Sequence, residues 1–280
     1  MLRNNEPLID DYNYMQFAGD VVVDGEKKAK GLVERDFTKY PQGYLKCAPA
    51  WSVDMPVIPR SEWSDRIKEM VETKSLLSDI RLTGDNGNPI PSLDQNGQGY
   101  CWAYSSTAAV MMLRAAMGQP YVRLSAHAVA CVIKRFRDEG GWGAHSLEFI
   151  TERGVPSVEF WAEKSMSRSY DTPATWENAK LHRVSEGWVD LSEAVYDRDL
   201  TFDQVMTCLL CRIPVVSDFN WWGHSVCAID PVEVERGSFG IRILNSWTDG
   251  WGDRGMGVLR GNKAVPDGAT APRVTLPSVK

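Results

Sequence analysis

This 280-residue sequence lacks features that are typical of membrane proteins, secreted proteins and nucleic-acid-binding proteins. It has no run of about 18 apolar residues that would span a bilayer. Its first residues, Met1 to Asp11, lack the basic start and apolar stretch of a signal peptide. The net charge is −6, and no basic cluster is long enough to follow a phosphate backbone. We therefore expect no membrane or nucleic-acid partner, and a location in the cytoplasm or in a non-secreted assembly such as a virion.

Cysteine and histidine are sparse as well. The six cysteines show no spacing typical of an extracellular disulfide framework, so we expect reduced thiols. Cys208 and Cys211 have the spacing of a redox or metal pair, but no second pair or nearby histidine accompanies them. We therefore interpret them as residues of a helix that pack in the protein core. His127, His145 and His182 stand alone and are interpreted as structural or surface residues. The sequence therefore predicts no metal site and no cofactor.

The pattern of apolar residues changes along the chain. Helical periodicity dominates the first half, whereas the second half has short runs typical of strands. The expected helices cover residues 61–77, 101–117, 124–136, 146–154 and 201–212. The expected strands cover residues 20–24, 179–190, 214–219, 224–230, 239–245 and 255–260. A helical region followed by a strand-rich region predicts an α+β fold.

Composition also divides the chain into three parts. Residues 1–84 contain few long periodic patterns, and the loop-forming cluster Gly84–Pro91 marks the beginning of a more regular region. Residues 85–261 hold most of the expected helices and strands. The remainder, 262–280, has three prolines and no clear pattern. We expect an N-terminal extension or arm, a central domain, and a C-terminal tail that forms an extended arm.

One cysteine occupies an unusual position. Turn-forming residues with Gly97 and Gly99 give way at Cys101 to a run of helix formers that ends before Gly118 and Pro120. Cys101 is therefore expected in the first turn of a buried helix. Unpaired backbone N–H groups there carry about half a positive charge, which favours the thiolate over the thiol. This predicts a nucleophile, provided that a base and an oxyanion site exist elsewhere.

Three other segments offer the missing parts of a thiol hydrolase. His224 follows Gly223 at the start of an expected strand, and Asn245 ends another. An imidazole beside the thiol would take its proton, and an amide oxygen would fix the orientation and tautomer of the ring. Gln95 lies six residues before Cys101, and its side-chain N–H would hold the oxyanion of a tetrahedral intermediate together with the Cys101 N–H.

These residues are where the chain resembles the papain-like cysteine peptidases. Four blocks match in order: a Gln-to-Cys-Trp segment, a Leu-Ser pair with a Gly-Gly pair, a Gly-His strand, and an Asn-Ser-Trp segment. They are Gln95–Ser105, Leu124–Ser125 with Gly140–Gly141, Gly223–Ile229 and Asn245–Gly257. The resemblance implies a two-lobe fold, with a helical lobe that carries the cysteine and a β-barrel-like lobe that carries the histidine and asparagine.

The resemblance also implies a role for each matching residue. Cys101 would be the nucleophile, His224 the general base and acid, Asn245 the orienting residue and Gln95 the oxyanion donor. Trp247 would shield the contact between His224 and Asn245. Gly140 and Gly141 would line the cleft, with Gly141 offering backbone hydrogen bonds to an extended peptide.

Two departures from the family pattern are visible. Gln98 stands where secreted members have a disulfide cysteine, and residues 137–139 before the glycine pair contain no partner cysteine. Both agree with a reduced protein, whose active-site loop must be held by packing and hydrogen bonds. In addition, the first 85 residues show no inhibitory-propeptide pattern.

The predicted function is a cysteine endopeptidase that hydrolyses peptide bonds in a peptide or protein substrate through an acyl-enzyme. The alternative is a papain-fold structural or interaction subunit of a larger assembly, such as a virus particle, that contacts other subunits through its N- and C-terminal arms. A third hypothesis keeps the thiol chemistry but changes the substrate, as in transglutaminases or cell-wall amidases. The segment Asn245–Trp247 argues against it, because those enzymes usually complete the site with Asp or a second His.

Overall fold

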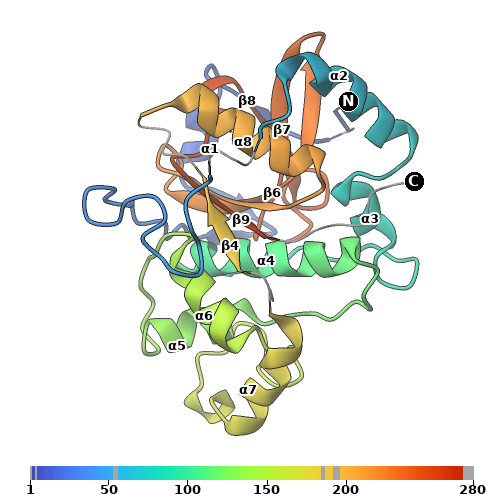
Figure 1. Cartoon of the computed structure of the whole chain (residues 1–280). Helices are drawn as coiled ribbons and strands as arrows, with labels where there is room; N and C mark the ends of the chain where they lie inside the picture. Colours follow the sequence, from blue (N-terminus) through green and yellow to red (C-terminus); the bar gives the residue numbers. More distant parts are fainter. Residues whose placement is uncertain (1, 4, 53–55, 184–186, 192–195, 274–280) are drawn as a thin grey trace.

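A computed structural model of the chain describes residues 2–3, 5–52, 56–183, 187–191 and 196–273. The described residues form a mixed sheet with helices on both sides (Figure 1). Helix α4 (Cys101–Ala116) runs between the sheet and a group of smaller helices, which cover its other face. Among the described residues, no helix is both long and apolar enough to cross a membrane.

The main sheet has seven strands in the order β1-β8-β7-β6-β5-β9-β4. All neighbouring pairs are antiparallel except β1 and β8, which are parallel. The strands are β1 (Leu8–Ile9), β8 (Met256–Arg260), β7 (Ser238–Leu244), β6 (His224–Glu235), β5 (Val215–Phe219), β9 (Gly268–Pro272) and β4 (Trp188–Asp190). The long strand β6 lies at the centre, so the residue that begins it is held by pairing with β5 and by packing on α4.

The helical part is built around α4, whose first thirteen residues are buried. Its run of alanine, methionine and leucine favours helix and leaves no polar face, as expected for a helix enclosed on all sides. Helices α5 and α6 pack against it on the side away from the sheet, and α7 lies beyond them (Figure 1). The bounds are α5 (Ala126–Ile133), α6 (His145–Arg153) and α7 (Pro173–Ala179), with 3-10 turns η1 (Arg168–Tyr170) and η2 (Lys180–His182).

A second apolar core lies on the opposite side of the sheet, under α2 and α8. It joins side chains from the N-terminal region, such as Trp63 and Ile67, to buried residues of α8 and of the sheet. The elements of this side are α1 (Met15–Ala18), α2 (Arg60–Glu72), α8 (Arg198–Leu210) and η3 (Gly261–Ala264). Helix α3 (Leu77–Thr83) instead packs against α4, and its buried Leu77 belongs to the core around α4. The first 84 residues therefore share a core with the sheet.

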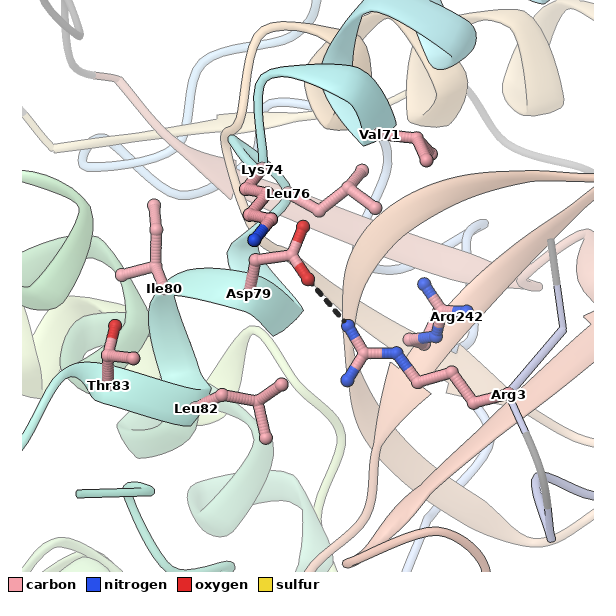
Figure 2. Close-up of a pocket in the computed structure, with 9 residues that line it drawn as sticks. All are labelled: Arg3, Val71, Lys74, Leu76, Asp79, Ile80, Leu82, Thr83 and Arg242. Atoms are coloured by element: carbon pink, nitrogen blue, oxygen red, sulfur yellow. Dashed lines mark hydrogen bonds and ion pairs between the residues drawn. The ribbon is translucent and has the colours of Figure 1, made fainter. Parts of the chain in front are cut away.

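The start of the chain is tied to the sheet by buried ion pairs. Arg242 on β7 binds Glu6 at 2.5 Å and Asp230 at 2.9 Å, and all three side chains are almost fully enclosed. Arg3 binds Asp79 at 2.9 Å next to Arg242, on the wall of a pocket of about 600 Å³ (Figure 2). These charges fix the position of the chain just before β1 joins the sheet.

A two-stranded hairpin is formed by β2 (Val21–Val23) and β3 (Glu26–Lys28), directly before residues 29–33, which contact the candidate site. Its turn residues Asp24 and Gly25 both have positive φ, at 53° and 79°, which is the turn that an Asp-Gly pair favours between antiparallel strands. The predicted strand at 20–24 is therefore confirmed as half of this hairpin.

Two expectations differ from the structure. Residues 179–190 were expected to form one strand, but the chain is helical up to His182 and only Trp188–Asp190 pairs as β4; residues 184–186 lie outside the described residues. The C-terminal tail was expected to be an extended arm, yet Gly268–Pro272 is strand β9, buried between β5 and β4. Its small side chains fit between two neighbouring strands, a fit that composition does not reveal. The domain boundaries at residues 84 and 261 stay a prediction.

Candidate active site

Cys101 is the first residue of α4 and is fully buried. Backbone N–H groups of Ser225, Gly31 and Trp102 lie close enough to lower the pKa of its thiol. Ser225 follows His224, so the thiol lies beside the beginning of β6. One turn further along α4, the hydroxyls of Ser105 and Ser225 are 2.7 Å apart and join the helix to the same strand. The fold therefore places the predicted nucleophile beside the strand that begins with the predicted base, and no hydrogen bond joins the thiol to His224 Nδ1 in this closed arrangement of the described residues.

His224 and Asn245 are hydrogen-bonded. His224 Nε2 lies 2.8 Å from Asn245 Oδ1, which also accepts the backbone N–H of Ser246 at 2.8 Å. Because two donors converge on Oδ1, the atom that faces the imidazole is the amide oxygen. An oxygen acceptor fixes the ring proton on Nε2 and leaves the lone pair on Nδ1, which has no hydrogen-bond partner among the described residues. This is the tautomer that a general base needs.

Trp247 covers this contact. Its ring stacks on that of His224 with centroids 4.4 Å apart and an interplanar angle of 24°, and it is completely buried. Trp222 meets both rings edge-on, at 5.1 Å from His224 and 5.7 Å from Trp247. Water is thus excluded from the hydrogen bond between His224 and Asn245, which strengthens it.

The loop with Gln95 is joined to the segment with Asn245. Asp94 and Trp247 form an antiparallel bridge, and the Gln95 N–H donates to the Ser246 carbonyl at 3.0 Å. The Ser246 hydroxyl in turn donates to Gln95 Oε1 at 2.6 Å, which turns the side-chain N–H groups of Gln95 away from that segment. The two segments are far apart in sequence, yet these bonds set the position of Gln95 relative to Asn245.

Hydrogen bonds replace the disulfide that secreted relatives would have at this loop. The Gly99 N–H donates to Asp138 Oδ1 at 2.8 Å, and the Tyr100 hydroxyl donates to the Arg137 carbonyl at 2.8 Å. Both bonds join the loop before Cys101 to the loop before the glycine pair. All six cysteines are free, as predicted.

The chain's own residues 29–33, which we call the occluding segment, fill the site. Gly31 O accepts the Gly141 N–H at 2.9 Å, and the Val33 N–H donates to Gly141 O at 2.7 Å, so Leu32 and Gly141 form a parallel bridge. The Leu32 N–H also donates to the carbonyl of Gly223 at 3.2 Å. A β-carbon on Gly31 would overlap the Gly99 carbonyl, so only glycine fits there. The glycine pair therefore binds an extended backbone, but one from the same chain.

Charged groups hold both ends of the occluding segment. Before it, the buried Lys28 binds Glu26 at 3.1 Å and Asp94 at 3.2 Å. Within it, Lys30 Nζ donates to the carbonyls of Ala18 and Gly19 at the end of α1, both at 2.5 Å. After it, Arg35 forms a buried bidentate pair with Asp190. No inhibitory-propeptide pattern was visible in the first 85 residues, yet residues 29–33 of this part of the chain lie against Gly141 and Gly223.

The enclosed site is electrically neutral. Burial raises the pKa of the Cys101 thiol to about 12, more than the nearby backbone N–H groups lower it. Burial also lowers the pKa of His224 to about 3, against the opposing effect of its bond to Asn245, and Lys30 lowers it further. The expected thiolate at the helix start is therefore wrong for this closed arrangement, because loss of solvent outweighs the helix dipole.

Comparisons with known proteins identify the fold. No protein-family model matches the chain. Mouse cathepsin K is 22% identical over 242 residues, which cover 81% of this chain and 70% of cathepsin K. A solved structure from work on the mite allergens Blo t 1 and Der p 1 matches with a TM-score of 0.59 and 17% identity, over 86% of this chain and 78% of that one.

Two further solved structures match the chain. The stem bromelain precursor gives a TM-score of 0.57 at 16% identity, over 87% of this chain and 83% of its own. Xylellain, a cysteine protease from Xylella fastidiosa, gives 0.53 at 17% identity, over 68% and 85%. The chain has the papain-like fold. The predicted α+β two-lobe fold and the resemblance to papain-like cysteine peptidases are confirmed, and these relatives support the predicted enzyme class.

Two features of this papain-like site were missed from the sequence. Asp218 on β5 is buried and accepts the Gly143 N–H at 2.6 Å, two residues after Gly141. Its signal was an acidic residue inside an otherwise apolar strand, since acidic side chains are rarely buried without a reason. The occluding segment gave no such signal, because its contacts to Gln95, Gly141 and Gly223 are all distant in sequence.

Proposed function

We propose that the protein is a cysteine endopeptidase that acts through Cys101, His224, Asn245 and Gln95. The observation that carries the proposal is the bond between His224 Nε2 and Asn245 Oδ1 under Trp247, which leaves Nδ1 as the basic nitrogen. The similarity to cathepsin K and xylellain supports the same class of reaction.

The reaction follows from these positions. The Cys101 proton passes to His224 Nδ1, and the sulfur attacks the scissile carbonyl carbon of a peptide. The resulting oxyanion is held by Gln95 Nε2 and the Cys101 backbone N–H. His224 then gives its proton to the leaving amine, the C–N bond breaks and a thioester remains. A water molecule, deprotonated by His224, hydrolyses the thioester and restores the thiol.

We also propose that the described arrangement is a latent state. Gln95 Nε2 donates to Ala29 O and Gln98 O, both at 3.0 Å, so the proposed oxyanion donor is already engaged. Gly141 is bound by the same segment, and Cys101 has no exposed surface. The occluding segment must leave before a peptide reaches the thiol, and solvent would then return to the site and favour the ionised pair.

Alkylation of the full-length chain tests both steps. Iodoacetamide should modify Cys101 slowly in the wild type, and Gly31→Ala should accelerate the reaction about tenfold or more, because the added methyl overlaps the Gly99 carbonyl. Gly19→Ala is the matched control, since a β-carbon at Gly19 meets nothing within 4 Å. Tryptic mass spectrometry identifies the labelled cysteine.

Peptide cleavage decides the function itself. The Gly31→Ala chain should cleave members of a peptide library, and the double variants with Cys101→Ala or His224→Ala should not. The enzymatic proposal fails if Gly31→Ala exposes the thiol but the protein cleaves no peptide. In that case the thiol should also react no faster than a free cysteine, and at a rate that does not depend on His224.

The alternative of a structural subunit in a larger assembly stays a hypothesis. The neutral, covered site is the observation that favours it, whereas the described parts of both expected arms pack into this chain's own sheet. Size-exclusion of the isolated chain against its native source would test it. A stable large particle that assembles equally well with Cys101→Ala would show that assembly is separate from catalysis. The free thiols fit a reducing compartment, and we propose a non-secreted location.

A further inference from the structure

Asp218 is an acidic residue whose charge is only partly satisfied. Its side chain lies on β5, 7% exposed, and its Oδ2 accepts the Gly143 N–H at 2.6 Å. Oδ1 accepts no hydrogen bond from the described residues. Burial raises the pKa of this carboxyl to about 6, although Ser225 and Gly143 act in the opposite direction. Buried carboxylates are normally paired, so an unpaired oxygen here calls for an explanation.

The unpaired oxygen lies next to the position where the site binds an extended backbone. Gly143 is two residues from Gly141, which pairs with Leu32 of the occluding segment. A small cavity of about 10 Å³ is lined by Asp218 together with Leu32 and Val33. The occluding segment therefore occupies the space in front of Asp218, and a side chain of any peptide that replaced it on Gly141 would enter that space.

The surroundings of this space carry several carboxylates and two arginines, Arg35 and Arg198. Asp267 also lines the cavity, and its charge raises the pKa of Asp218. A surface hollow of about 730 Å³ shares Arg35 and Asp267 with this cavity, and its lining also includes Glu34, Asp36 and Arg198, which lies 4.0 Å from Asp267. Arg35 lowers the pKa of Asp218, but its guanidinium is bound to Asp190 and belongs to the stretch that directly follows the occluding segment. Arg35 is bound to Asp190 and Arg198 to Asp267, and neither donates to Asp218 Oδ1, so that oxygen is left for a cationic side chain of a peptide in the cleft.

We propose that Asp218 is a specificity-determining residue that selects substrates with a lysine or arginine side chain at the position paired with Gly141. This proposal rests on the proposed peptidase function and names its substrate class. The cation would donate to Oδ1 while Oδ2 keeps the Gly143 N–H, which satisfies both oxygens of the carboxylate. A neutral aliphatic side chain in the same place would leave the buried charge unpaired.

Substrates that differ only in charge give the most direct test. Full-length chain with Gly31→Ala is assayed on fluorogenic peptides in which each position is varied in turn among lysine, acetyl-lysine, arginine, citrulline and norleucine. At one position, lysine and arginine should give a kcat/KM about tenfold or more above that of their neutral counterparts. Equal rates for charged and neutral side chains at every position would overturn the proposal without affecting the peptidase function.

Asp218→Asn isolates the charge, because an asparagine oxygen still accepts the Gly143 N–H. The preference for lysine over acetyl-lysine, taken as the ratio of their kcat/KM values within each variant, should fall to near one. Asp267→Asn, at a more exposed carboxylate, should reduce the preference only slightly. A preference that persists in Asp218→Asn would assign it to another residue and overturn the proposal.

A binding measurement separates this proposal from failure of the catalytic one. If the Gly31→Ala chain cleaves nothing, calorimetry with the Gly31→Ala, Cys101→Ala chain and the same lysine and acetyl-lysine peptides still reports the selectivity. Tighter binding of the lysine peptide that is lost in Asp218→Asn supports a cation-selective cleft in a protein that is not a peptidase. Equal or undetectable binding of both peptides overturns it.

Discussion

Gln95 donates its side-chain amide to the carbonyl oxygen of Ala29 over 3.0 Å. The group proposed to stabilise an oxyanion is thus occupied by a neutral carbonyl of the same chain. A carbonyl is the group that a substrate would present there, so the occluding segment imitates part of a substrate while its backbone runs parallel to Gly141. Whether the site is closed or open to a substrate therefore depends on how firmly the occluding segment is held.

Lys30 is predicted to be one of the anchors that hold it. Its ammonium donates to the carbonyls of Ala18 and Gly19 at 2.5 Å, where cations stabilise the C-terminus of a helix. Lys30→Met removes these bonds, and Cys101 should then react with iodoacetamide several-fold faster than in the wild type. Lys27→Met is the control, because Lys27 pairs only with the exposed Asp20. Equal rates in both variants would show that Lys30 does not restrain the segment.

The bond between His224 and Asn245 gives a prediction about protonation. Burial holds the pKa of His224 at about 3, and the bond from Asn245 acts to raise it. Asn245→Asp places a carboxylate on Nε2, which stabilises the imidazolium and should raise the pKa of His224 by about 1–3 pH units. An NMR titration of the histidine Cε1–H signals measures it, with His224→Gln to assign the resonance.

Two outcomes of that titration are informative. A signal that is absent in His224→Gln and moves to higher pKa in Asn245→Asp supports the observed bond. A His224 signal with the same pKa in wild type and Asn245→Asp would mean that residue 245 does not contact the imidazole in solution.

The proposed catalytic residues could be singled out from sequence because each stands in a short motif that begins or follows a regular element. Cys101 begins helix α4 and His224 begins strand β6, whereas Asn245, expected to end a strand, directly follows β7. Gln95 and Trp247 followed from the same motifs. The resemblance to papain-like peptidases sufficed to select these residues, although their positions in the fold depend on bonds between distant segments, such as that from Ser246 to Gln95.

What the sequence did not reveal depends on contacts between distant segments. The occluding segment has no periodicity and is defined only by its bonds to Gly141, Gly223 and Gln95. Strand β9 consists of small residues and a proline, and it is a strand because β4 and β5 flank it. The protonation state of Cys101 was mispredicted for the same reason. The helix start that favours the thiolate is visible in the local sequence, whereas the burial that raises the pKa of the thiol comes from segments distant in sequence.

The buried pair between Glu6 and Arg242 is predicted to be important for stability. Both side chains are almost fully enclosed, and Arg242 also binds Asp230 at 2.9 Å. Glu6→Gln removes one of the charges that compensate the buried guanidinium, which should lower the free energy of unfolding by about 3 kcal/mol or more. Chemical denaturation measures the change, and Asp20→Asn, at an exposed ion pair, should leave the midpoint unchanged. A similar midpoint for both variants would contradict the prediction.

The last prediction concerns the pH dependence that Asp218 gives to folding. Its pKa is about 6 in the folded chain, above the ordinary value of 3.8 that applies when the chain is unfolded. Between these values the folded state binds more protons than the unfolded state, so this group makes the protein less stable as pH rises from about 4 to 7. Removing the charge should remove that loss of stability.

Asp218→Asn should therefore gain stability relative to the wild type across this pH range, by at most about 3 kcal/mol for a difference of roughly two pH units. Urea denaturation of both proteins at pH 4 and pH 7 measures the difference between them at each pH, so effects of the substitution that do not depend on pH cancel. The Glu6→Gln variant, measured in parallel, controls for general destabilisation. If the difference between Asp218→Asn and wild type is the same at both pH values, the folded-state pKa of Asp218 is not raised, and its unpaired oxygen is solvated or paired in solution.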